Sequence, residues 1–116
     1  IDDIYSMPIN VGKYKNIGVC INYLLTSGEN TIDKITGVKE ISDMKSFVKC
    51  EQRLFEGDSY NTNRIVDYPI FSVYSVVDNM EQLINDVNYM NSKFSVLNHE
   101  GDSLLKEKFD PELLKN

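Results

Sequence analysis

The sequence has no tryptophan, one histidine and two cysteines among its 116 residues. A catalytic or metal-binding histidine normally has an orienting partner, and His99 has only Glu100 beside it, so we interpret it as a solvated loop residue. Cys20 and Cys50 match no zinc-binding spacing, and both fall in apolar segments. We therefore expect two buried thiols in a reducing compartment, with a disulfide between neighbouring strands as the alternative.

Basic residues are also few, with 12 Lys and Arg against 18 Asp and Glu and a formal net charge of −6. Binding to nucleic acid or to anionic lipid needs clustered Lys and Arg, and no three occur in a row here. No apolar run approaches the ~18 residues of a membrane-spanning helix. The first residues, from Ile1 to Tyr5, lack the regions of a secretory signal. We predict a cytoplasmic protein without a nucleic-acid or membrane partner.

Phosphate-binding glycine loops and paired catalytic carboxylates are missing as well. The six glycines are isolated, which is typical of turns and bulges. The acidic residues are spread along the chain, and no pair is flanked by apolar residues on both sides, as acid–base catalysis would require. We predict no catalytic residue and no metal ligand in this chain.

What the sequence does contain is the composition of one globular domain, 41% hydrophobic and 26% charged. Apolar residues alternate over residues 17–25, which predicts a strand. Residues 31–35 predict a second strand, which we expect to pair with the first as a hairpin across the turn at Gly28.

The middle of the chain predicts a helix, a strand and a loop. Apolar residues spaced three apart from Val38 predict a short helix. Residues 46–55 predict a half-exposed strand with Val48 and Cys50 on its apolar face. Residues 58–68 are polar, and we interpret them as a loop or an irregular ribbon.

The last third contains the strongest patterns. Residues 70–77 are apolar on both faces, which predicts a central strand. A four-turn amphipathic helix should follow, with Asp78 as its N-cap. Residues 94–97 predict a short strand, and Pro111 predicts a terminal helical turn.

The predicted order is β-β-α-β-β-α-β, an α+β fold with a small antiparallel sheet and two helices on one face. Residues 1–15 have little periodicity and are interpreted as a connector, and residues 16–116 as the folded domain. Arg64 lies in the polar segment before the predicted central strand, where its guanidinium could bind a carboxylate or a phosphate. A surface ion pair with Asp58 or Asp67 is the alternative.

Three short motifs then carry a resemblance. They are the run from Ile35 through Gly37 into the short helix, the Glu56-Gly57-Asp58 turn, and Arg64 before an apolar strand and a long helix. Over about residues 17–105 this order resembles the C-terminal domain of ATP-grasp carboxylate–amine ligases. The relatives are the L-amino-acid ligase and glycinamide ribonucleotide synthetase types, within the carbamoyl-phosphate synthase-like superfamily. Relatives usually carry glycines around the arginine, where this chain has Asn63 and Ile65.

The resemblance implies a parent enzyme that activates a carboxylate with ATP and magnesium and passes the acyl group to an amine. The nucleotide and metal sites would belong to the preceding domain, so this lobe would bind no cofactor and would not be catalytic alone. Residues 1–15 would be the linker from that upstream catalytic domain, and residues 16–116 the C-terminal lobe. The lobe would pack against that domain and help to close the substrate side of the cleft. Arg64 would be the substrate-binding residue, an electrostatic partner for carboxylate or phosphoryl oxygens.

Two other readings stay open. A small α+β sheet also describes ferredoxin-like regulatory domains, which bind a small molecule at the interface of a homodimer. A protein-interaction domain would instead expose an apolar patch.

Overall fold

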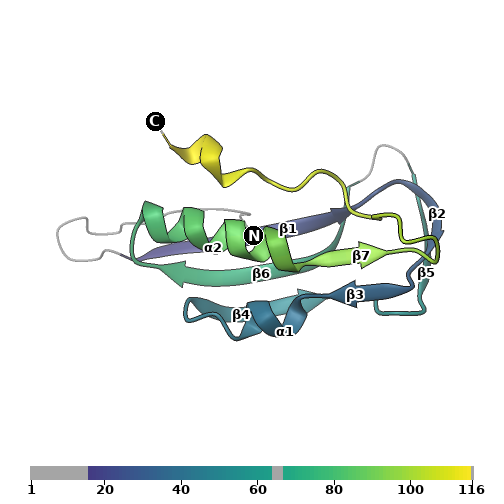
Figure 1. Cartoon of the computed structure of the whole chain (residues 1–116), viewed down its shortest axis with the longest axis horizontal. Helices are drawn as coiled ribbons and strands as arrows, with labels where there is room; N and C mark the ends of the chain where they lie inside the picture. The colour runs from purple at the N-terminus through teal and green to yellow at the C-terminus, as the bar shows by residue number, and fades with distance from the viewer. Residues whose placement is uncertain (1–15, 64–66, 116) are drawn as a thin grey trace.

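The computed structural model describes residues 16–63 and 67–115 (Figure 1). The elements are β1 (Ile17–Leu25), β2 (Gly28–Thr31), β3 (Lys34–Thr36), α1 (Val38–Ser42), β4 (Phe47–Gln52), β5 (Ser59–Thr62), β6 (Tyr68–Val77), α2 (Met80–Lys93), β7 (Ser95–Leu97) and the 3-10 turn η1 (Pro111–Leu114). Within the described residues all strand pairs are antiparallel and there are two α-helices, so this is a small α+β domain, as predicted.

The main sheet has the strand order β1-β6-β4. β6 is central, as its two apolar faces predicted, and Ile70, Phe71 and Val73 are fully buried. β1 runs antiparallel to β6 with Ile21 opposite Val73. β4 lies on the other side of β6, at the edge of this sheet.

Both helices lie on one face of the main sheet, in front of β6 and β4 in Figure 1. The alternating residues of β1 that face this side are buried, which confirms the period-two pattern. Three rings join the sheet to α2: the Phe71 and Phe94 centroids lie 4.6 Å apart, and those of Tyr23 and Phe94 lie 4.8 Å apart. Ile41 of α1 is fully buried in the same core.

The expected hairpin between residues 17–25 and 31–35 is wrong. β2 pairs with β5, and β3 pairs with β7. Between them the chain crosses from one partner to the other: the N–H of Ile32 donates to Asp58 O, and that of Asp33 donates to Leu97 O, both at 2.8 Å. Alternation predicts which side chains face inward, but it does not choose the partner strand.

Three smaller predictions need correction. Residues 58–68, interpreted as a loop or an irregular ribbon, contain the regular strand β5 and the first residue of β6. The register of β4 shifts between Phe47 and Lys49, so Val48 is 58% exposed and does not share a buried face with Cys50. The N-cap of α2 is Asn79, whose side chain accepts from the N–H of Gln82.

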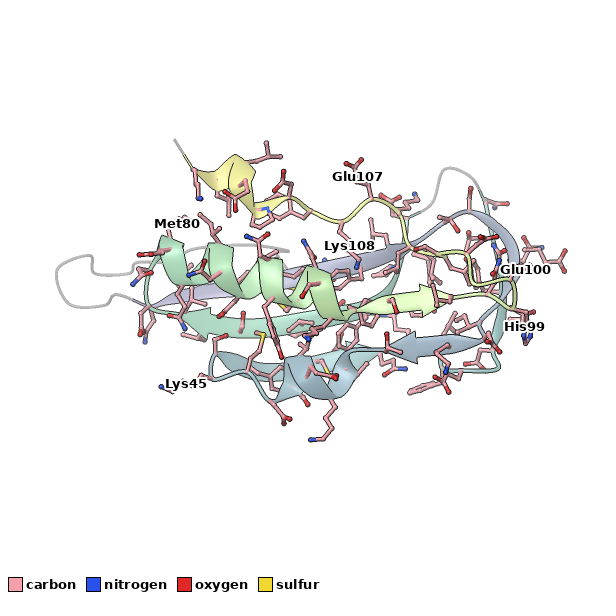
Figure 2. All side chains as sticks on the ribbon, viewed as in Figure 1. Lys45, Met80, His99, Glu100, Glu107 and Lys108 are labelled. Atoms are coloured by element: carbon pink, nitrogen blue, oxygen red, sulfur yellow. The ribbon has the colours of Figure 1, made fainter. Side chains whose placement is uncertain are left out.

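The C-terminal segment runs back along α2, as Figures 1 and 2 show. Lys108 points toward the end of the helix, and its Nζ donates to Asn91 O and Phe94 O, both at 2.6 Å. Asn91 in turn donates to Phe109 O at 2.7 Å. These bonds satisfy carbonyls that a helix end otherwise leaves unpaired.

Candidate functional site

Arg64, the residue with a predicted substrate-binding role, lies outside the described residues. The chain's other arginine, Arg53, follows β4 and lies at the centre of a polar row. This row crosses the face of the main sheet opposite the helices, because the side chains of β1, β6 and β4 on that face alternate with those of the core. Sequence reasoning missed it, since the three strands contribute its members from distant parts of the chain.

Arg53 is fixed by three hydrogen bonds. One guanidinium nitrogen donates to Pro69 O at 3.1 Å and to Ser72 Oγ at 3.0 Å, and the other donates to Glu51 Oε1 at 3.0 Å. Ser72 is only 1% exposed and donates its own proton to Asn22 Oδ1 at 2.5 Å. The row therefore links one strand to the next through side chains and holds the guanidinium in a fixed orientation.

Tyr74 and Lys49 continue the polar row toward the edge strand. The Tyr74 hydroxyl donates to Glu51 Oε1 at 3.4 Å, and Lys49 Nζ lies 4.9 Å from the centre of the Tyr74 ring. Burial raises the pKa of the Tyr74 phenol, and Cys20 and Glu51 nearby raise it further. A phenol is already a hydrogen-bond donor at neutral pH, and the raised pKa extends that state to higher pH.

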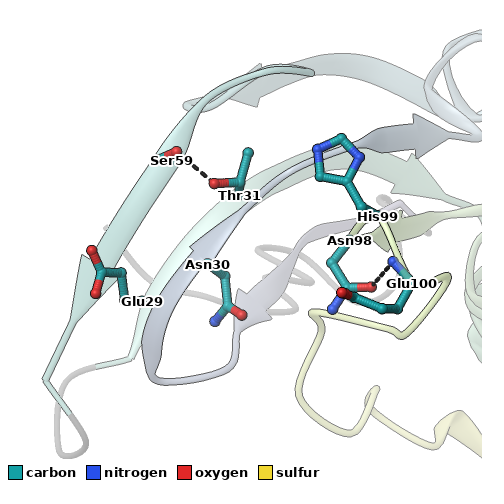
Figure 3. A pocket seen from close by; sticks show the side chains of 7 residues that line it. All are labelled: Glu29, Asn30, Thr31, Ser59, Asn98, His99 and Glu100. Carbon is teal, nitrogen blue, oxygen red and sulfur yellow. Dashed lines mark hydrogen bonds between the residues drawn. The ribbon is translucent and has the colours of Figure 1, made fainter.

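A second polar feature lies at the far end of the molecule, between the β2–β5 ribbon and the turn after β7 (Figure 3). It is a hollow of about 390 Å³. Its lining consists of Glu29, Asn30, Thr31, Ser59, Asn98, His99 and Glu100. Carboxylates, amides and hydroxyls thus surround it, together with one imidazole.

His99 has a partner that the sequence did not reveal. Its Nδ1 lies 3.0 Å from Asp33 Oδ1, and both side chains are largely exposed. The predicted neighbour, Glu100, instead has its backbone N–H bound to Asn98 Oδ1 at 2.9 Å. The nearby hydroxyls of Thr31 and Ser59 bond to each other at 2.7 Å. Since their contact is with each other, we assign no nucleophile to this group.

Residues 16–63 and 67–115 contain no group of three or more His, Cys, Asp or Glu placed to hold a metal ion. In the same part of the chain no helix is both long and apolar enough to cross a membrane. Neither Cys20 nor Cys50 forms a disulfide, so the alternative of a disulfide between them is wrong. Burial raises the pKa of the Cys50 thiol.

The arrangement can therefore bind and orient polar groups of a ligand or partner. It does so through the fixed guanidinium of Arg53 on one face and the polar hollow at one end. Comparison with protein-family models, with curated proteins and with solved structures finds no match.

Proposed function

We propose that this chain is the C-terminal lobe of an ATP-grasp carboxylate–amine ligase, which supports closure of the substrate side of the cleft and is not catalytic alone. The proposal rests on the resemblance of its motifs, and the geometry of two of those motifs supports it. Such an enzyme works where ATP is available, so the proposal includes a cytoplasmic location.

The observation that carries the proposal is that both glycines of the resembling motifs occupy positions that suit glycine. Gly37 has a φ of +100°, and a Cβ there would lie 2.3 Å from Lys93 O. Gly57 has a φ of +95° in the turn after β4. The neighbouring Asp58 fixes this turn by accepting the N–H of Phe55 at 2.8 Å. The motifs therefore determine how the β3–α1 and β4–β5 connections turn.

In the proposed reaction a substrate carboxylate oxygen attacks the γ-phosphorus of ATP, and ADP leaves. The amine then attacks the acyl carbon, the phosphate leaves, and the amine nitrogen releases a proton. ATP and magnesium would be held by the preceding domain. No step is assigned to a metal on this chain, because the resemblance implies that the nucleotide and metal sites belong to the preceding domain.

In the proposed reaction this lobe has a positioning role and carries out no chemical step. The helix-free face of the main sheet carries the polar row, and Arg53 holds a fixed positive charge on it next to Glu51. A rigid sheet with oriented donors is suited to pack on a catalytic domain and to keep water out of a closing cleft. The proposed partner is therefore the upstream ATP-grasp domain of the same protein.

The test is to express the complete coding sequence and to assay ADP formation with a panel of amino acids as carboxylate substrates. Hydroxylamine intercepts an acyl phosphate and converts it to a hydroxamate, which is measured directly. We expect hydroxamate to form only with both ATP and a carboxylic acid present. A coding sequence without an ATP-grasp domain, or ATP turnover with no hydroxamate and no amide product, would contradict the proposal.

The polar hollow favours a second candidate, a stand-alone domain that binds a small polar molecule. A ligand that binds only the folded state raises the melting temperature, and the increase grows with the logarithm of the ligand concentration once the site is largely occupied. A thermal-shift screen of amino acids and nucleotides on the 116-residue chain separates the two functions. Concentration-dependent stabilisation that the Asn98→Ala variant abolishes would favour the binding module over the ligase lobe.

A further inference from the structure

β4 has an edge that the rest of the described chain leaves unpaired. It forms a ladder with β6 on one side only and is the last strand of the main sheet. The N–H of Arg53 donates to Ile70 O at 2.9 Å. This bond shows which residues of the strand have main-chain N–H and C=O groups that point toward β6, because these groups alternate from one residue to the next. Lys49 and Glu51 therefore direct their main-chain groups toward β6, whereas Cys50 and Gln52 direct theirs outward.

Such an edge attracts other strands unless its side chains prevent it. β4 carries two of the usual protections, a lysine at position 49 and the register shift that exposes Val48. An arbitrary apolar strand placed on this edge would leave Lys49 without a counter-charge. The edge therefore discriminates among partners by charge.

The charge order on β4 is self-complementary. Suppose that a second copy of β4 pairs with the first in the antiparallel direction, with Cys50 opposite Cys50. The residue numbers of any two residues that face each other then add up to 100. Lys49 of each copy then lies opposite Glu51 of the other, on the same face of the joined sheet. Cys50 lies opposite its own counterpart, and its outward main-chain groups complete the central pair of hydrogen bonds.

We infer that the β4 edge is a homodimer interface, in which two copies pair around Cys50 and form a continuous six-stranded sheet. The occupant is a second copy of this chain because the Lys49–Glu51 pairing is satisfied twice in that arrangement. This inference is independent of the proposed ligase function, since it concerns only the sheet edge.

The test is a charge-reversal cycle on the 116-residue chain, followed by sedimentation equilibrium at low salt from about 10 µM to about 1 mM protein. The unmodified chain should dimerise. Lys49→Glu and Glu51→Lys should each raise the dissociation constant by about tenfold or more, because like charges then face each other twice. The double variant should regain the original constant within about threefold, since the charges face each other in reversed order.

Two further samples test whether the effect comes from the Lys49–Glu51 charge pairs. An equal mixture of the two single variants should form a heterodimer more readily than either variant alone, because both charge pairs are opposite in sign. Lys39→Glu is the matched control, since Lys39 lies on α1 with its side chain 84% exposed, and it should dimerise like the unmodified chain. A chain that is monomeric throughout the range would overturn the inference. So would a double variant as impaired as the singles, because the lost Glu51–Arg53 contact would then explain the effect.

Discussion

Gly37 packs against the carbonyl group of Lys93, so closely that a Cβ at position 37 would lie 2.3 Å from that oxygen. This contact joins the start of α1 to the end of α2. Neither the glycine nor the carbonyl can move without disturbing β3 and β7, which pair just beyond them.

Gly37→Ala should lower the free energy of unfolding by about 2–4 kcal/mol, because it combines a backbone clash with a φ that favours glycine. Gly57→Ala is the control, since Gly57 also has a positive φ but nothing lies within 4 Å of its Cβ position. The control should cost only about 1 kcal/mol. Urea unfolding of both variants measures the difference. Equal losses would show that the close approach to Lys93 carries no energy of its own.

Ser72→Ala should destabilise the chain by about 1–3 kcal/mol, because Ser72 is 1% exposed and bonds both Arg53 and Asn22. Ser59→Ala removes a hydroxyl of the same chemistry from the exposed pair with Thr31. We expect the Ser59 variant to change stability by less than about 0.5 kcal/mol. If both variants unfold at the same urea concentration, the polar row contributes nothing to stability and Arg53 is held by other means.

Stability should fall at alkaline pH partly through Tyr23. Its hydroxyl donates to Asn91 Oδ1 at 2.7 Å, and burial raises the pKa of the phenol far above its ordinary value. Above about pH 10 the unfolded chain releases this proton while the folded chain keeps it, so stability present below that pH is lost as the pH rises.

Tyr23→Phe should therefore show a flatter loss of stability between about pH 10 and pH 11.5. Its free energy of unfolding at neutral pH should be lower by about 1 kcal/mol, because the hydrogen bond to Asn91 is missing. Urea unfolding at several pH values measures both effects. Parallel pH profiles for the two proteins would contradict the assignment to Tyr23.

Arg64 allows a test of the ligase proposal in the complete enzyme. Arg64→Ala is expected to lower kcat/KM by about tenfold to a thousandfold, because the proposed guanidinium stabilises charge on the substrate. Arg64→Lys should recover part of this loss, since it keeps the charge but not the fork of donors. Exposed Lys45 gives the control, Lys45→Ala. Unchanged turnover and KM in the Arg64→Ala enzyme would show that the residue does not reach the site.

The elements predicted well are those whose signal is local. The four-turn periodicity of α2 predicts a helix with one buried face, and the apolar run of β6 predicts a strand buried on both faces. The structure confirms both predictions. The N-cap of α2 was misplaced by one residue, because Asp78 and Asn79 are both good caps. Only the geometry of the first turn decides between them.

The strand pairings could not be predicted, because no local pattern names a distant partner. β5 has a single buried residue, Tyr60, so its alternation is too weak to distinguish it from a loop. The polar row had one sequence signal, the alternating Glu51 and Arg53, which place both charges on the same face of one strand. Its remaining members could be found only once β6 was placed between β1 and β4.

The central position of β6 also determines the order of events during synthesis. β1 is made first, but its partner β6 follows 52 residues later, as the pairing of Ile21 with Val73 shows. At about 5–20 residues per second, a ribosome needs about 3–10 s to supply that partner. For that time an apolar strand is exposed to the cell without its neighbour. Translation speed between β1 and β6, and the chaperones present at the ribosome, should therefore influence how much of this protein accumulates in folded form.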